Sequence, residues 1–115
     1  MERDLNLIRE ILISLTKKIH SGPSQMLVNG YSKDIISYNC QLLVNAGYIT
    51  ALVSSLGTVL PKALTQKGQE FINPIRNWRT WDKVLAEIDK CKLPENFDEL
   101  KSIITIVVRN EITQP

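Results

Sequence analysis

The chain is poor in the residues that build disulfide-stapled, metal-binding and redox proteins. Its 115 residues include two cysteines and one histidine. Cys40 and Cys91 stand too far apart in the chain to match a metal-ligand or redox spacing. We therefore expect free, buried thiols and no metal or other cofactor, although a disulfide between them stays open. A chain of this length buries enough apolar surface to fold without such staples.

The chain also lacks a long hydrophobic run. Its longest, Ile103–Val108, is far shorter than a membrane-spanning helix. The N-terminal residues 1–4 carry charges of both signs, unlike a signal peptide. We expect a cytoplasmic protein with no membrane contact.

Catalytic motifs and strong charge are absent as well. No nucleophile elbow, P-loop, dinucleotide fingerprint or zinc spacing occurs, and the single His20 suits the end of a helix better than a catalytic centre. We therefore predict no enzymatic activity. The net charge is +2, with seven Lys/Arg against four Asp/Glu in residues 1–67 and seven against eight in the remainder. This slight bias is compatible with phosphate contacts but does not predict them.

What the chain does contain is a clear order of helix and strand signals in its first half. Apolar residues recur at helical spacing over residues 5–19, and the glycine and proline of His20–Ser24 end that helix. Residues 25–28 can form a short strand, which the turn dipeptide Asn29-Gly30 stops. It stays open whether a short helix precedes Ser32.

A second helix, a hairpin and a third helix follow. Ser32 is a good N-cap for a helix that runs to about Asn45 and ends at Gly47. Residues 48–53 and 59–64 favour paired strands around a tip at residues 54–58, and Pro61 suits an edge position. With Thr65 opening another helix, this order is typical of an α+β winged helix-turn-helix, in which the hairpin is the wing.

The C-terminal part, from residue 77 on, is predicted to be a helical extension of that core. Pro74 kinks or ends the third helix, and Thr80 is the expected cap of a helix that Leu93-Pro94 breaks. A last amphipathic helix spans roughly residues 95–109. We predict a winged-helix core at 1–76 and a helical extension at 77–115, packed on the core as one domain.

At this point the chain resembles the domain-of-unknown-function family 2513, a family of small bacterial and phage proteins similar to winged-helix regulators. The resemblance covers about residues 2–90. The residues that carry it are Arg3-Asp4, Leu7-Ile8-Arg9, Ile11-Leu12, Gly30-Tyr31-Ser32, Ala46-Gly47-Tyr48-Ile49, Leu64-Thr65, Gly68, Glu70-Phe71 and Trp81-Asp82-Lys83. It implies a winged-helix fold in a bacterial or prophage setting and supplies no activity. The family often has histidine where this chain has Asn39 and Gln69, so no histidine role transfers.

The function that this fold suggests is sequence-dependent binding of double-stranded DNA in transcription control. The second helix would enter the major groove, and the wing would contact the backbone. Gln and Asn can pair with adenine, and Lys can contact phosphate. Against this, the helix has no arginine, and Asp34 shares the face of Gln41. The predicted contacts are Lys33, Ser37, Tyr38, Gln41 and Asn45 on the helix and Ser54, Ser55, Thr58 and Lys62 on the wing, with Lys17, Lys18 and Lys67 flanking them.

The alternative is a winged-helix adaptor that binds another protein and no DNA. The last helix is apolar enough to serve a homodimer or a protein partner, or simply to pack back along the first helix. Trp78 and Trp81, with Arg76 and Arg79 interleaved, could stack on single-stranded bases. We favour the reading that both tryptophans anchor the appended helices to the core.

Overall fold

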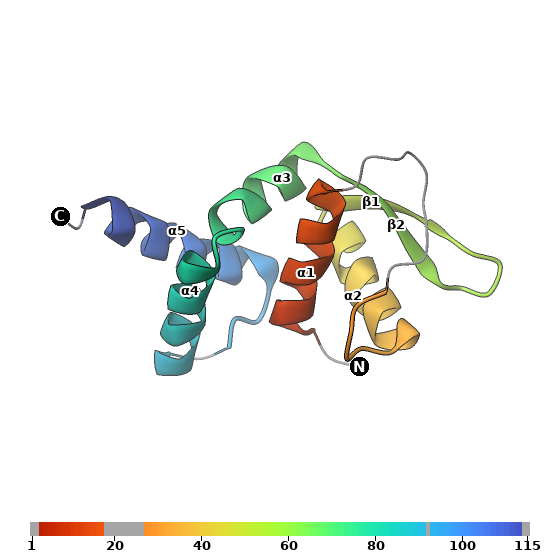
Figure 1. Ribbon diagram of the computed structural model, residues 1–115, viewed down its shortest axis with the longest axis horizontal. Helices are drawn as coiled ribbons and strands as arrows, with labels where there is room; N and C mark the ends of the chain where they lie inside the picture. The colour runs from red at the N-terminus through yellow and green to blue at the C-terminus, as the bar shows by residue number, and fades with distance from the viewer. Residues whose placement is uncertain (1–2, 18–26, 92, 114–115) are drawn as a thin grey trace. The chain divides into compact units, whose positions relative to one another are not determined.

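The structure is a computed structural model that describes residues 3–17, 27–91 and 93–113. The chain divides into two compact units, residues 1–72 and residues 73–115. The boundary predicted from the sequence, between the core and the helical extension, falls after residue 76 instead. The first unit is formed by α1 (Leu5–Thr16), α2 (Lys33–Asn45), β1 (Ile49–Val53), β2 (Val59–Leu64) and α3 (Gln66–Ile72). It is mainly helical, with a two-stranded antiparallel sheet (Figure 1).

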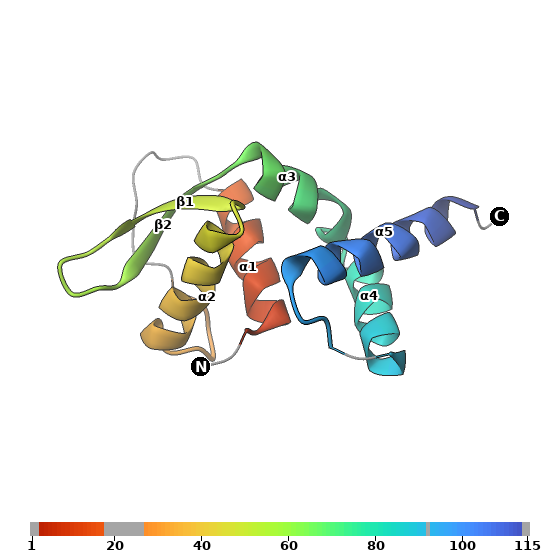
Figure 2. The ribbon, with the colours of Figure 1, turned by 180° about the vertical axis from the view of Figure 1, so that it is seen from behind.

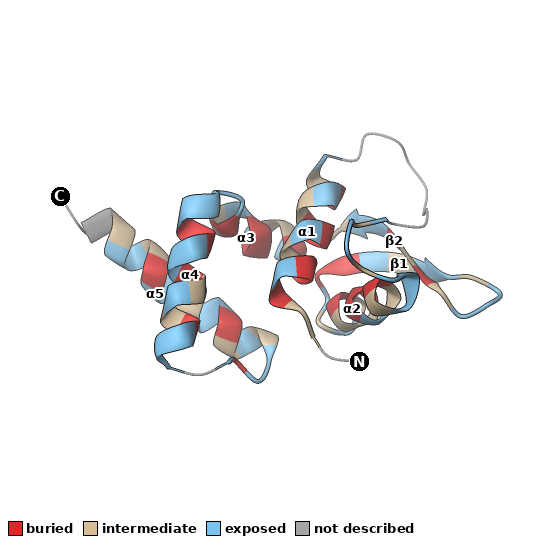
Figure 3. Ribbon diagram, turned by 60° about the horizontal axis from the view of Figure 1, so that its bottom comes forward, coloured by how far each residue is buried: buried red, intermediate tan, exposed pale blue. Residues whose placement is uncertain are grey.

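Helix α1 lies at the centre of the first unit and packs against α2, α3 and β2. Asp4 caps its N-terminus, where one carboxylate oxygen accepts a hydrogen bond from the Leu7 N–H over 3.0 Å. Its buried positions, red in Figure 3, are Leu5, Leu7, Ile8, Ile11, Leu12 and Leu15. This stripe confirms the predicted apolar face of the first helix. The predicted helix end at residues 20–24 lies outside the described residues, and so does the first half of the predicted strand 25–28; Leu27 and Val28 are in no strand.

Local signals set both ends of α2, as predicted. The Tyr31 N–H donates to the Val28 oxygen over 3.2 Å and closes a turn in which Gly30 has φ +88°. The Ser32 Oγ then accepts from the Ile35 N–H over 3.3 Å and caps the helix. At the other end Gly47 adopts φ +81°, which glycine tolerates and other residues rarely adopt.

The sheet is one hairpin with an irregular register. Thr50 pairs with Ala63, but the next residue, Ala51, pairs with Pro61, so Lys62 is an extra residue on β2. Proline has no N–H to donate, and a bulge beside it lets the pairing continue. With only two strands in the sheet each strand is an edge, which confirms the edge position expected for Pro61.

The second unit contains a short 3-10 turn and two helices. The turn η1 (Asn73–Ile75) packs against both α4 (Trp78–Lys90) and α5 (Phe97–Thr113), which pack against each other. The turn confirms that α3 ends before Pro74. The buried apolar positions described on the two helices are Trp81, Val84 and Ile88 on α4 and Leu100, Ile104 and Val107 on α5.

Two expectations for this unit are wrong. Thr80 does not cap α4, because Asn77 does so by accepting from the Arg79 N–H over 2.9 Å. The Thr80 hydroxyl is buried instead and lies 3.2 Å from both carboxylate oxygens of Glu111. Trp81 is buried as expected, but Trp78 is 62% exposed and therefore does not anchor the helix. Its ring has the Arg79 guanidinium 5.5 Å from its centroid.

The two thiols also differ from each other. Both cysteines are free, and Cys40 is buried as predicted, whereas Cys91 is exposed. Burial raises the pKa of the Cys40 thiol to about 12. Cys40 therefore stays a protonated, apolar side chain of the α2 core face at neutral pH.

Candidate nucleic-acid interface

Helix α2 and the hairpin are fastened together in the first unit. The Ser37 Oγ on α2 accepts a hydrogen bond from the backbone N–H of Val59, the first residue of β2, over 2.9 Å. From this junction the hairpin extends beyond α1 and α2, as the views from the front and from behind both show (Figures 1 and 2). The helix and the hairpin therefore form one continuous surface.

The predicted reading face of α2 is solvent-accessible. Lys33, Tyr38 and Asn45 are exposed, and Ser37 and Gln41 are half-buried. The Gln41 Nε2 donates to the Asn45 Oδ1 over 2.9 Å, so two amides one helical turn apart form a pair on the surface. Ser37 also joins α2 to the hairpin, because its hydroxyl oxygen accepts a hydrogen bond from the Val59 N–H.

On the hairpin, the predicted contacts divide in the same way. Ser54 shapes the tip, because its Oγ accepts from the N–H groups of Leu56 and Thr58 over 3.3 and 3.1 Å. Ser55 and Lys62 are exposed, and Thr58 is half-buried. Lys62 occupies the bulge, and a bulge re-aims the side chain it carries.

The charge pattern of this surface is a feature that the sequence analysis missed. No Asp or Glu occurs between Asp34 and Glu70, a stretch that includes nearly all of α2 and the whole hairpin. The only charged residues within it are Lys62 and Lys67. Because the stretch carries no carboxylate, it does not repel an approaching phosphate backbone. Counting charges over residues 1–67 hid this local pattern.

The position of α2 is fixed by a set of contacts that we call the α2–α3 lock, made by residues 46–48 and residues 65–68. The Thr65 Oγ1 donates to the Gly47 oxygen over 2.6 Å, and the Thr65 N–H donates to the Tyr48 oxygen over 3.1 Å. The Lys67 Nζ donates to the Ala46 oxygen over 2.8 Å and lies 5.1 Å from the centroid of the Tyr48 ring. The Lys67 ammonium group therefore interacts with the C-terminus of α2, where a cation is favourable. It does not stand free beside the surface as the predicted flanking contact requires.

The lock continues into the core. The Tyr48 ring is buried and stacks on Phe71, with 4.6 Å between the ring centroids. Thr65 also caps α3, because its Oγ1 accepts from the Gly68 N–H over 3.1 Å. This confirms the predicted roles of Thr65 as a cap and of Tyr48 as a structural residue.

Asn39 holds the other end of α2 against the N-terminal segment. Its side chain is fully buried; the Oδ1 accepts from the Asp4 N–H over 2.9 Å and the Nδ2 donates to the Ile35 oxygen over 2.9 Å. Near it, burial first and the Asp4 carboxylate second raise the pKa of Tyr31. These groups position α2 and are not part of its exposed face.

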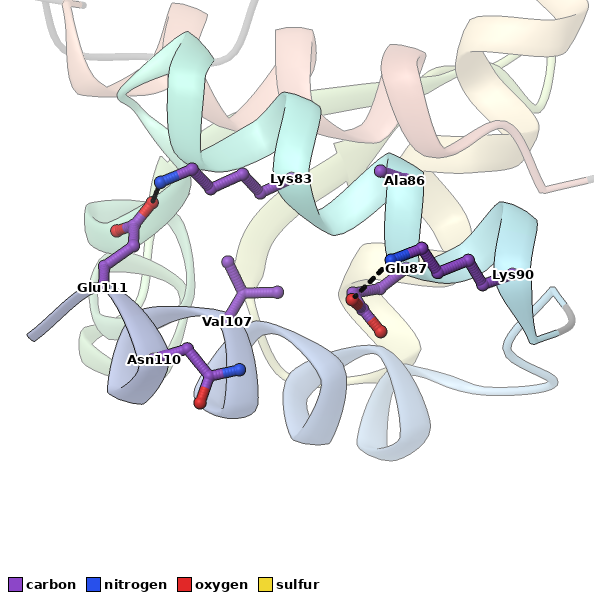
Figure 4. A pocket seen from close by; sticks show the side chains of 7 residues that line it. All are labelled: Lys83, Ala86, Glu87, Lys90, Val107, Asn110 and Glu111. Atoms are coloured by element: carbon purple, nitrogen blue, oxygen red, sulfur yellow. Dashed lines mark ion pairs between the residues drawn. The ribbon is translucent and has the colours of Figure 1, made fainter. Parts of the chain in front are cut away.

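The second unit has a pocket of about 240 Å³ between α4 and α5 (Figure 4). Lys83 pairs with Glu111 over 3.2 Å and Lys90 with Glu87 over 3.9 Å, so each lysine on its wall faces a carboxylate. Across the described parts of the chain, no three His, Cys, Asp or Glu side chains gather into a metal site. The charged groups on this wall of the pocket are thus engaged in ion pairs with one another.

Helix α5 has a large apolar side chain exposed to solvent. Ile106 is 53% exposed, whereas Leu100, Ile104 and Val107 are buried. Within residues 3–17, 27–91 and 93–113 there is no helix whose length and apolar character would let it cross a membrane.

Comparison with known proteins finds a family model and a relative that match most of the chain. The model of a family described as "Hypothetical protein (DUF2513)" matches residues 2–93. A protein of Haemophilus influenzae described as "Uncharacterized protein" is 29% identical over 113 residues, which cover 94% of this chain and 96% of that protein. No solved structure matches the chain.

Proposed function

We propose that this chain, which belongs to the DUF2513 family, is a winged helix-turn-helix protein that binds duplex DNA and regulates transcription in a bacterial or prophage setting. In this proposal α2 is the recognition helix and the β1–β2 hairpin is the wing. The order helix, hairpin, helix supports the assignment, as does the bond from Ser37 to Val59 that joins α2 to the wing.

The observation that carries the proposal is the absence of Asp and Glu from the hairpin and from α2 beyond Asp34. Lys33 stands exposed at the start of α2, and the bulge presents Lys62 from β2. Both ammonium groups can contact phosphate, while no acidic residue after Asp34 opposes them on either element. Asp34 itself is exposed in the first turn of α2, where it is stabilised by the helix dipole.

The paired amides of Gln41 and Asn45 give this surface a means of reading sequence. An amide side chain carries both a donor and an acceptor, and the major-groove edge of adenine offers an acceptor and a donor side by side. The hydrogen bond between the two side chains orders them before DNA arrives, which lowers the entropy lost on binding.

The proposal is tested by selection of bound sequences from a pool of random duplex DNA, followed by titration of an enriched duplex at about 50 and 200 mM salt. We expect salt-sensitive binding. Lys62→Glu should weaken binding to all duplexes and lower the slope of log K against log salt by about one. Gln41→Ala should instead reduce the preference for the enriched sequence, at a cost of about 1–3 kcal/mol.

The matched control for the charge reversal is Lys101→Glu, which makes the same exchange at an exposed position of α5 in the second unit. It should leave both affinity and salt slope unchanged, and circular dichroism should show all variants folded. Absence of binding by the wild-type protein at 50 mM salt would refute the proposal, and so would equal losses in Lys62→Glu and Lys101→Glu.

A second candidate is a winged-helix adaptor that binds a protein or a second copy of this chain through α5. The observation that favours it is the exposed Ile106. An outcome without DNA binding would bring this candidate forward, and light scattering of the wild-type chain would then separate a homodimer from a monomer that needs another partner.

A further inference from the structure

The tip of the hairpin presents a leucine to solvent. Leu56 is 93% exposed, and the strand below it adds Leu52 at 53% and Val53 at 63%. Single exposed leucines are common on protein surfaces. What distinguishes Leu56 is how firmly the chain around it is held and how little charge accompanies it.

Four hydrogen bonds fix the tip, which we define as residues 54–58. Two join backbone groups, from the Ser54 N–H to the Thr58 oxygen and from the Gly57 N–H to the Ser54 oxygen, each over 2.9 Å. The other two run from the Leu56 and Thr58 N–H groups to the Ser54 Oγ. Gly57 adopts φ +86°, which completes a tight turn of the kind that closes short hairpins. The loop therefore holds Leu56 outward at little further entropic cost when a partner binds.

The tip carries no charged residue at all, since residues 54–58 read Ser-Ser-Leu-Gly-Thr. It therefore has no ammonium or guanidinium group for a phosphate, although the nearby Lys62 does. A neutral tip with an outward leucine matches the apolar faces of stacked bases better than it matches the charged backbone. Apolar side chains enter the minor groove in this way, as wedges that part a base step and bend the duplex.

We propose that Leu56 is such a wedge, which inserts between two base pairs from the minor groove and kinks the DNA that α2 reads. The inference rests on the proposed function, because it needs the duplex bound along α2 and the hairpin. Lys62 contacts the backbone on the way to the groove, and the hydrogen-bonded tip supplies the rigidity that insertion requires. The chain is then a DNA-bending protein as well as a sequence reader.

The experiment uses the 115-residue chain and the enriched duplex, with 2-aminopurine placed at successive steps of the site and a dye at each end of the same duplex. The wild-type protein should raise 2-aminopurine fluorescence at one step and increase energy transfer between the ends. Leu56→Ala should abolish the fluorescence rise and most of the transfer change, and should lower affinity about tenfold. Its salt slope should equal that of the wild type, because no phosphate contact is removed.

The control is Leu93→Ala, which removes an equally sized exposed leucine, 62% exposed, from the second unit. It should bind, unstack and bend as the wild type does. A wild-type protein that binds without unstacking or bending overturns the wedge and leaves the proposed function standing, and so does a Leu56→Ala variant that bends fully. A wild-type protein that binds no duplex overturns both. Binding of the tip to lipid vesicles or to a protein in place of DNA would likewise overturn both the wedge and the proposed function.

Discussion

Gly68 is a position where a single added methyl group should destabilise the first unit. A Cβ built on Gly68 would lie 1.9 Å from the Tyr48 oxygen, 2.9 Å from its carbonyl carbon and 3.2 Å from its Cα. These are backbone atoms, and the same oxygen accepts the Thr65 N–H of the α2–α3 lock. No rotamer change can relieve the clash, so α3 must move away from Tyr48 by about 1.5 Å before ordinary contact distances return.

The size of the effect follows from three contributions. Forcing an extra methyl group into a packed site costs about 1–3 kcal/mol, and weakening the Thr65–Tyr48 bond costs about 1 kcal/mol more. Alanine is the better helix former by about 1 kcal/mol and offsets part of this. We expect Gly68→Ala to lower the free energy of unfolding by about 1–3 kcal/mol, a sizeable share of the roughly 4–10 kcal/mol available to a unit of this size.

Urea unfolding followed by circular dichroism measures this change as a shift of the transition midpoint. The matched control is Gln66→Ala, which changes an exposed position in the same helix. Its free energy of unfolding should stay within about 0.5 kcal/mol of the wild-type value. If Gly68→Ala is as stable as the wild type or more so, the close approach of α3 to Tyr48 is wrong, and with it the account of the lock.

Two further predictions concern the buried side chains of Asn39 and Cys40 on α2. Asn39→Leu should lower the free energy of unfolding by about 1–3 kcal/mol in the same urea assay, because it removes the acceptor of the Asp4 N–H; the exposed Asn45→Leu should cost much less, and equal losses would contradict the buried bonds. The thiol of Cys40 has a folded pKa of about 12 against an ordinary value of 9.0, so the folded state retains its proton while the unfolded state releases it. Stability that is complete below pH 9 should therefore fall between pH 9 and about 12, by up to about 1.4 kcal/mol per pH unit, and this part of the fall should be missing in Cys40→Ala.

Much of the first unit could be predicted because its signals are local. A serine before an amphipathic run caps α2, Asn29-Gly30 makes a turn, and Gly47 ends the helix; each acts within a few residues of itself. Strand pairing also followed from β-branched runs around a short polar tip. None of these depends on a distant partner, so the sequence alone carries them.

The misses have distant causes. Asn77 and Thr80 are both capable caps, and what separates them is that Thr80 bonds to Glu111, which lies 31 positions further along the chain. The bulge that turns Lys62 outward depends on the register of the whole hairpin, which a single strand does not reveal. Trp78 and Trp81 look alike in sequence, and only the packing of the second unit makes one exposed and the other buried.

The difference between residues that hold the core and residues that stay exposed explains why family membership does not identify a partner. The motif residues whose contacts are clearest, Thr65, Gly68 and Tyr48, are occupied with one another in the α2–α3 lock. A residue that holds the core together serves the fold whatever the protein binds, so a match over residues 2–93 leaves the target undefined. The side chains that packing leaves exposed, Leu56 and Lys62 on the hairpin above all, are under no such constraint. If the hairpin is a contact surface, members with different targets should differ there first, while the lock that aims α2 stays the same.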